Sequence, residues 1–97
     1  MKACHAFLAG LLLYAGTAPA PAVEAPPGAA SCTGCHAAGA NVDTPVPRLA
    51  GQDAAAMVAA MQAFRSGQRT ATVMERIAKG FSDDEIEAIA TWFGAQH

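Results

Sequence analysis

Apolar side chains recur at helical spacing in the second half of the chain. Met57, Met61 and Phe64 follow the i, i+4, i+7 spacing of one helix face. Gly67 comes soon after them, where a glycine commonly ends a helix because it accepts a left-handed backbone. The pattern predicts an amphipathic helix over residues 52–66, with both methionines on its core-facing side.

The C-terminal segment carries the clearest local helix signal. Ser82 and Glu85 are spaced as a capping box, in which each side chain binds the backbone N–H of the other residue. The apolar residues that follow form one stripe with Trp92 on its flank: Ile86, Ile89, Ala90 and Phe93. A shorter helix over residues 73–79, ended by Gly80, is expected just before this one.

The other segments are rich in turn-forming residues and show no strand pattern. Residues 32–38 can form one or two helical turns, and residues 39–51 are irregular, with glycine, asparagine and proline at intervals. A structureless stretch of that length in a small domain is usually functional or disordered. The sequence therefore predicts an all-α fold of three helices and a helical turn, joined by long loops of the kind that wrap a prosthetic group.

Residues 1–22 have the pattern of an export signal. Lys2 precedes an apolar run over residues 6–16, and small residues and prolines follow it. This run is too short to cross a bilayer, since a spanning helix needs about 20 apolar residues. We expect cleavage before Val23 and export to the periplasm, with Cys4 removed alongside the signal. A signal that is kept as a membrane anchor is the alternative.

The expected mature chain consists of a tail and one small domain. Residues 23–30 are rich in proline, alanine and glycine and predict a flexible tail, followed by a domain over residues 31–97. From residue 23 onward, five Lys and Arg stand against eight Asp and Glu, so the charge favours neither nucleic acid nor an anionic membrane surface. Only three phenylalanines lie in this part of the chain, so we expect a group other than side chains to complete the core.

One motif carries recognisable chemistry. Cys32, Cys35 and His36 form C-x-x-C-H, the attachment sequence of c-type haem. Cysteines three residues apart on a helical turn bring both sulfurs to one side, at the spacing of the two vinyl groups along one porphyrin edge. The motif predicts one haem c, bound covalently through Cys32 and Cys35, with His36 as an iron ligand.

Other uses of the cysteine pair fit the rest of the chain less well. A zinc site needs four ligands, and after the signal the chain offers only Cys32, Cys35, His36 and His97. A thioredoxin-like redox pair belongs to a βαβ pattern, which is missing here. A structural disulfide between residues three apart would close almost no loop.

The residue on the other face of the iron decides what the haem can do. Met74 follows a loop and opens a short helix 38 residues beyond His36, so the chain has room to pass over the haem and return. Met57 and Met61 lie on a regular helix face, and His97 ends the chain, where residues fray. We therefore predict Met74 as the second axial ligand. A histidine–methionine pair would raise the potential and leave no place for a substrate. His97 or an open site are the alternatives.

The order of these features resembles a class I cytochrome c. After the C-x-x-C-H motif come a P-x-L-x-G stretch at residues 47–51, a helix ending in F-R-S-G, Met74 and an aromatic C-terminal helix. In that family the proline carbonyl binds the second ring N–H of the histidine ligand, which implies that Pro47 orients His36. The family's sixth ligand is a methionine before the last helix, and this corresponds to Met74.

Residues 64–67 and 73–82 resemble more narrowly the cytochrome subunit of flavocytochrome c sulfide dehydrogenase. Related two-haem periplasmic cytochromes share the P-x-L-A-G-Q stretch, whereas this chain has a single C-x-x-C-H motif. The resemblance implies an electron-transfer subunit that is no enzyme by itself and receives electrons from a sulfide-oxidising flavoprotein. A freestanding electron shuttle between other redox proteins is one alternative, and an open-site haem protein that binds gas or catalyses a reaction is another.

The chain departs from the family before its first cysteine. Members have a full N-terminal helix there that crosses the C-terminal helix, but residues 26–28 (Pro-Pro-Gly) leave space for at most a turn and a half. We therefore expect an abbreviated N-terminal helix, with Trp92 and Phe93 packed on Ala29, Ala30 and the haem. The consequence would be lower stability, or a partner subunit that covers this face.

The haem propionates need cationic or amide donors. Arg48, Arg65 and Arg69 are the candidate cations, and ordinary solvated charge is the alternative for each. Arg48 is preferred because it lies in the loop expected to wrap the haem, and Gln52 is a further candidate.

Overall fold

The computed structural model describes residues 15–39 and 42–97, so the expected signal run over residues 6–16 lies almost entirely outside the described residues. Four helices follow one another along the chain: α1 (Ala29–Cys32), α2 (Ala54–Ser66), α3 (Met74–Ala78) and α4 (Asp83–Gly94). The described ranges contain no strand, which confirms the predicted all-α class. No described helix has both the length and the apolar character needed to cross a bilayer.

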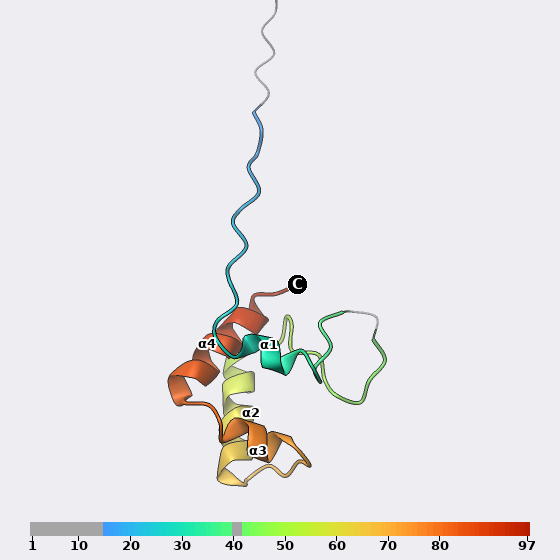
Figure 1. Cartoon of the computed structure of the whole chain (residues 1–97), viewed down its shortest axis with the longest axis vertical. Coiled ribbons are helices and arrows are strands. Elements are labelled where there is room, and N and C mark those ends of the chain that lie inside the picture. The colour runs from blue at the N-terminus through green and yellow to red at the C-terminus, as the bar shows by residue number, and fades with distance from the viewer. Residues whose placement is uncertain (1–14, 40–41) are drawn as a thin grey trace, which may run out of the picture.

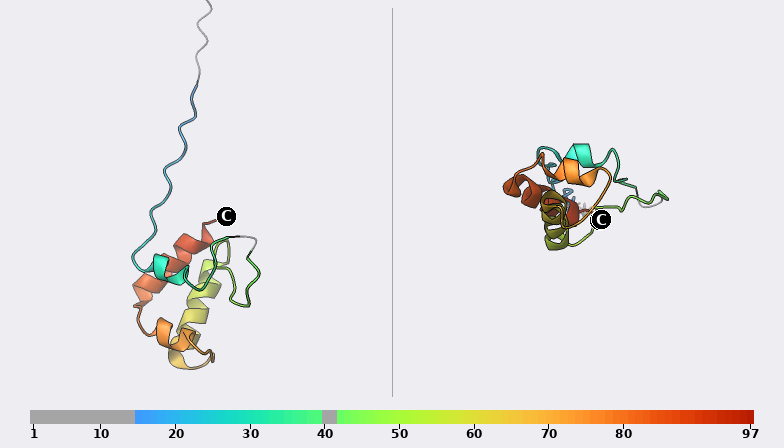
Figure 2. Two further views of the ribbon diagram at one scale, coloured as in Figure 1. Left: turned by 45° about the vertical axis from the view of Figure 1, so that its right-hand side comes forward. Right: turned by 90° about the horizontal axis from the view of Figure 1, so that it is seen from below.

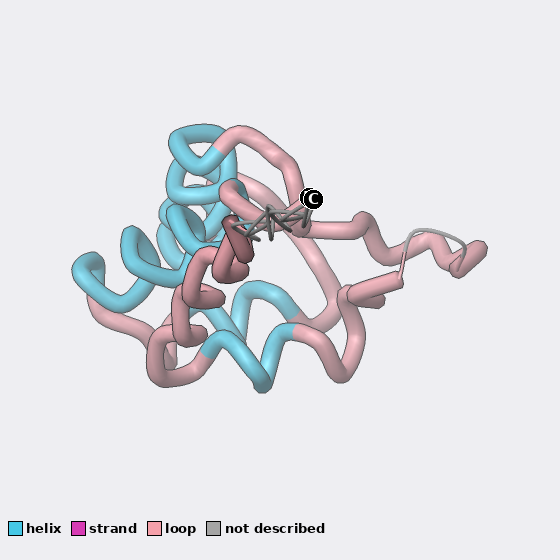
Figure 3. The backbone as a smooth tube through the Cα atoms, turned by 90° about the horizontal axis from the view of Figure 1, so that it is seen from above, coloured by secondary structure: helices cyan, strands magenta, loops and turns pink. Residues whose placement is uncertain are grey.

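The two long helices, α2 and α4, pack against each other and form the centre of the fold (Figure 1). The short helices α1 and α3 lie on the same side of this pair, as the view from below shows (Figure 2). The segment between α1 and α2 leaves the helices as a long loop and returns to them (Figure 3). The fold therefore places the C-x-x-C-H turn and the start of α3 on one side of a two-helix support.

The ends of α2 and α4 are set by the local signals that the sequence predicts. At the start of α2 the Asp53 carboxylate accepts a hydrogen bond from the Ala56 N–H at 2.8 Å, and Gly67 ends the helix with a φ of 78°. At the start of α4 the Ser82 N–H donates to the Glu85 carboxylate at 2.7 Å, and the Glu85 N–H donates to the Ser82 hydroxyl at 3.2 Å. The predicted capping box is confirmed.

Helix α1 begins three residues earlier than the turn expected over residues 32–38. Gly28 has a φ of 89°, a left-handed conformation that reverses the chain direction just before the helix. Beyond the helix one further turn closes, because the His36 N–H donates to the Cys32 carbonyl at 2.9 Å. Ala29 and Ala30, which the sequence assigns to the tail, thus form the first turn of α1.

The core is made of small and medium-sized side chains. Ala29 is fully buried, and the residues clustered with it are Met57, Ile89, Ala90 and Phe93. Met57 is thereby confirmed as a core residue, and Met61 is half-buried. Among the described residues no large side chain is completely buried. The helices alone do not enclose a large interior, as expected for a chain whose core is completed by another group.

Candidate functional site

The C-x-x-C-H segment forms a helical turn at the end of α1. Cys32 is half-buried and Cys35 is exposed, and both are free thiols with no disulfide between them. Burial raises the pKa of the Cys32 thiol, and a hydrogen bond with Ser31 opposes this in part. Both sulfurs are therefore available for thioether bonds to a haem.

The ring of His36 is held by the loop that follows it. Its Nδ1 lies 2.5 Å from the carbonyl oxygen of Pro47, the contact that the resemblance implies. A carbonyl oxygen can only accept, so Nδ1 is the donor in this contact, and in the neutral ring Nε2 is then the nitrogen with the free lone pair. This tautomer presents Nε2 to a metal, in the arrangement by which backbone carbonyls usually orient ligating histidines.

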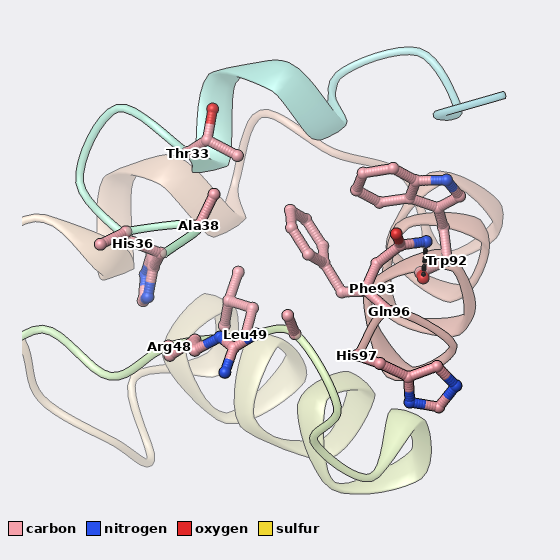
Figure 4. Close-up of a pocket in the computed structure, with 11 residues that line it drawn as sticks. Thr33, His36, Ala38, Arg48, Leu49, Trp92, Phe93, Gln96 and His97 are labelled. Carbon is pink, nitrogen blue, oxygen red and sulfur yellow. Dashed lines mark hydrogen bonds between the residues drawn. The ribbon is translucent and has the colours of Figure 1, made fainter. Parts of the chain in front are cut away.

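A pocket with mainly apolar walls opens beside His36 (Figure 4). Leu49 reaches it from the loop before α2, and Phe93 reaches it from α4 and points toward the C-x-x-C-H segment. Trp92 lies next to Phe93 at the pocket's edge. Apolar walls of this kind suit the face of a porphyrin, and low polarity around a haem raises its potential.

The same pocket includes a cation without a complete set of partners. The Nε atom of Arg48 is buried and makes no hydrogen bond to the protein, whereas its neighbour Gln52 donates a side-chain hydrogen bond to the Arg48 backbone carbonyl. An unpaired buried donor is unfavourable unless a further acceptor binds it. The residues present therefore fit a group that is apolar over most of its surface and carries an anionic oxygen, as haem does.

The other two candidate arginines are bound within the protein. Arg65 forms an ion pair with Asp83 and donates to the Phe81 carbonyl at 3.2 Å, so it ties the end of α2 to the start of α4. The Arg69 guanidinium lies 4.7 Å from the centre of the Phe64 ring. Of the three candidates, Arg48, the one preferred from the sequence, is thus the arginine with an unpaired buried nitrogen.

The candidate axial methionine begins a helix on the side of the fold that holds His36. Met74 is the first residue of α3 and is half-buried, and α3 and α1 lie on the same side of the α2–α4 pair (Figure 2). The competing His97 is exposed and lines the edge of the pocket formed by the end of α4. Across residues 15–39 and 42–97 no three His, Cys, Asp or Glu side chains gather in a way that could hold a metal ion.

Comparison with known proteins places the chain in a family. The family described as "Cytochrome C oxidase, cbb3-type, subunit III" matches residues 28–93. The cytochrome subunit of sulfide dehydrogenase from Chlorobaculum tepidum is 41% identical over 64 residues, which cover 66% of this chain and 58% of that protein. The thiosulfate dehydrogenase electron acceptor from Thiomonas intermedia is 40% identical over 86 residues, covering 87% of this chain and 39% of that protein.

A third relative is matched over most of its own length. Cytochrome c-554(548) from Halomonas halodenitrificans is 34% identical over 70 residues, which cover 68% of this chain and 84% of that protein. The sulfur-linked relatives are longer, since the aligned part spans between 39% and 58% of their lengths. The family match, the helical fold and the C-x-x-C-H turn agree. The chain belongs to the class I cytochrome c family, whose members bind haem c covalently and transfer electrons.

Proposed function

We propose that this protein carries single electrons in the periplasm as the cytochrome subunit of a sulfide-oxidising flavoprotein complex. The support is the 41% identity to the cytochrome subunit of sulfide dehydrogenase, together with a single C-x-x-C-H motif in the chain. A thiosulfate dehydrogenase electron acceptor is similar at 40% identity, and this favours a freestanding carrier as the second candidate. Both relatives are named for an electron transfer in the oxidation of an inorganic sulfur compound.

The observation that carries the proposal is the arrangement around His36. Thioethers at Cys32 and Cys35 would hold the haem, and the Pro47 carbonyl orients the His36 ring so that its Nε2 would be available to the iron. When bound, the haem supplies one-electron redox chemistry. The polypeptide supplies a fixed ligand geometry, so little rearrangement accompanies the gain or loss of an electron.

Met74 is proposed as the second axial ligand and Arg48 as the cation for a propionate. A thioether ligand stabilises ferrous iron and raises the potential. The unpaired buried Nε of Arg48 supports the second role, because an anionic oxygen would satisfy it. With His36 and Met74 both bound to the iron, the site would transfer electrons and would leave no open position for dioxygen or a substrate.

Optical spectroscopy of the holocytochrome tests the axial ligand. The oxidised protein should show the near-infrared charge-transfer band of methionine on ferric haem, and the reduced protein should bind carbon monoxide slowly. Met74→Ala should abolish the band, lower the potential and open the iron to carbon monoxide. Met61→Ala is the matched control, since Met61 is also half-buried but lies within α2. Fast carbon monoxide binding to the unaltered protein would instead support the open-site alternative.

Isolation of the protein from its own periplasm tests the assignment as a subunit. A complex with a flavin-containing protein, in which sulfide reduces the haem, would support it. A haem protein that elutes as a monomer without flavin, and is reduced by a thiosulfate-oxidising enzyme, would support the freestanding carrier. N-terminal sequencing of the same material checks the expected start at Val23.

A further inference from the structure

The segment before α1 lies against α4 instead of leaving the domain at once. The indole Nε1 of Trp92 donates to the backbone carbonyl of Val23 at 3.1 Å, a contact between residues 69 positions apart. Residues 15–22 before this contact are exposed and project away from the helices (Figure 1). Among the residues from 15 onward, Val23 is therefore the first that is anchored to the domain.

The other end of the segment is fixed by close packing. A Cβ atom at Gly28 would lie 2.7 Å from the ring of Phe81 and 3.4 Å from Ile89, so only a glycine allows this approach. The next residue, Ala29, is fully buried in the core. Between the two anchors stand Pro26 and Pro27, whose rings restrict φ and lower the entropy lost when the segment is held.

Trp92 connects this segment to the pocket beside His36. Its ring meets that of Phe93 edge to face, with centroids 4.9 Å apart and an interplanar angle of 74°. Both aromatic rings line the pocket that contains His36 (Figure 4). A contact that holds the Trp92 ring in place therefore also holds this aromatic wall of the pocket in place.

We propose that residues 23–28 form a strap that positions the aromatic wall of the haem pocket through Trp92. The strap lies where the family has a full N-terminal helix, and residues 15–28 of this chain contain no helix. It rests on the proposed function only in treating the pocket beside His36 as part of the haem site. Trp92 is a positioning residue in this scheme, and Val23 and Gly28 are the two ends of the strap.

If the strap acts in this way, the residue at which the mature chain begins affects the potential of the haem. A chain that begins at Val23 keeps the carbonyl bound by Trp92, whereas one that begins at Pro26 loses it. Without the anchor, Trp92 can move and water can enter beside Phe93. Greater polarity around a haem stabilises the ferric form, so the potential should fall.

Holocytochromes with three different first residues test the proposal: Gly16, Val23 and Pro26. The first two should have equal potentials and a Trp92 indole N–H that exchanges slowly with solvent. The chain from Pro26 should show faster indole exchange and a lower potential, although it keeps Gly28 and the buried Ala29. Comparison of the chains from Gly16 and Val23 is the control, because it removes only exposed residues.

Trp92→Phe keeps an aromatic ring and removes the donor. In the chain from Val23 this change should lower the potential as the truncation does, and each change should lower the folding equilibrium constant about fivefold, the effect of one hydrogen bond. Combined, the two changes should have no more effect than either alone. Any one of three results would overturn the proposal. These are equal potentials in the chains from Val23 and Pro26, fast indole exchange in the chain from Val23, and effects of the truncation and of Trp92→Phe that multiply when the two are combined. None of these results depends on the near-infrared band or on carbon monoxide binding, which test the electron-transfer function separately.

Discussion

Gly28→Ala is expected to be among the most destabilising single-methyl changes in this protein. Gly28 has a φ of 89°, and an added Cβ would lie 2.7 Å from the Phe81 ring, closer than carbon atoms approach without a shift. The ring cannot move away freely, because Phe81 packs against the core cluster and its carbonyl accepts a hydrogen bond from Arg65. The methyl group must therefore displace either the strap or the start of α4.

The expected cost is the sum of a conformational and a steric contribution. A left-handed backbone costs a non-glycine residue about 1–2 kcal/mol. Overpacking of a filled site typically adds about 1–3 kcal/mol. Alanine also lowers the conformational entropy of the unfolded chain, which offsets about 0.4–1 kcal/mol of this cost. The free energy of unfolding should fall by about 1–5 kcal/mol. Each kcal/mol corresponds to about 4–8 °C in the melting temperature of a domain this small.

Gly67→Ala separates the two contributions. Gly67 has a φ of 78°, close to that of Gly28, but no atom lies within 4 Å of an added Cβ. This control should lose only the conformational part, about 1 kcal/mol. The assay is denaturant unfolding of each holocytochrome, followed by circular dichroism. Equal losses in the two variants would refute the close approach of Gly28 to Phe81. Phe81→Leu should recover part of the loss in Gly28→Ala and none of the loss in Gly67→Ala.

Two further predictions concern charge. Arg48→Met should lower the potential, since a cation beside a haem disfavours ferric iron. Arg65→Met should leave the potential unchanged and reduce the free energy of unfolding by about 1 kcal/mol, because the partly exposed bonds of Arg65 to Phe81 and Asp83 are lost. Redox titration and denaturant unfolding of both variants test this, and the opposite pattern would show that the two roles are exchanged. Hydrogen bonds from the Ser82 backbone and hydroxyl hold the pKa of Glu85 below its usual value of 4.5. The capping box therefore adds stability above that pH, which is lost as the pH falls through the lower folded-state pKa. Glu85→Gln should flatten this part of a stability–pH curve, and an unchanged curve would show that the capping carboxylate does not contribute.

The features that follow reliably from the sequence are those that depend on residues a few positions apart. The α4 capping box depends on two side chains three positions apart, and the α2 stop depends on one glycine, so both follow from local rules. The contact between His36 and Pro47 spans 11 residues, and it was expected from the family resemblance rather than from any periodicity.

The features that sequence analysis left open depend on tertiary position. Arg48 and Arg65 have the same side chain, and only the packed structure shows that one has an unpaired buried nitrogen while the other joins two helices. The bond between Trp92 and Val23 joins residues that no local pattern relates. A proline-rich stretch before a domain predicts a flexible tail on composition, and its ends are held here by one indole and one close glycine contact.

The brevity of α1 explains why both the strap and the cofactor matter to this fold. A four-residue helix is far below the length at which helices are stable in water, about 12–15 residues, so tertiary contacts must hold it. Gly28 and Ala29 fix its first turn against α4, and Cys32, at its last residue, is where the first thioether to the haem forms. The helix is thus held from the strap at one end and from the cofactor at the other. A shift at either end changes the position of His36, because its backbone N–H is bound to the carbonyl of Cys32. The strap is therefore mechanically coupled to His36, the proposed iron ligand.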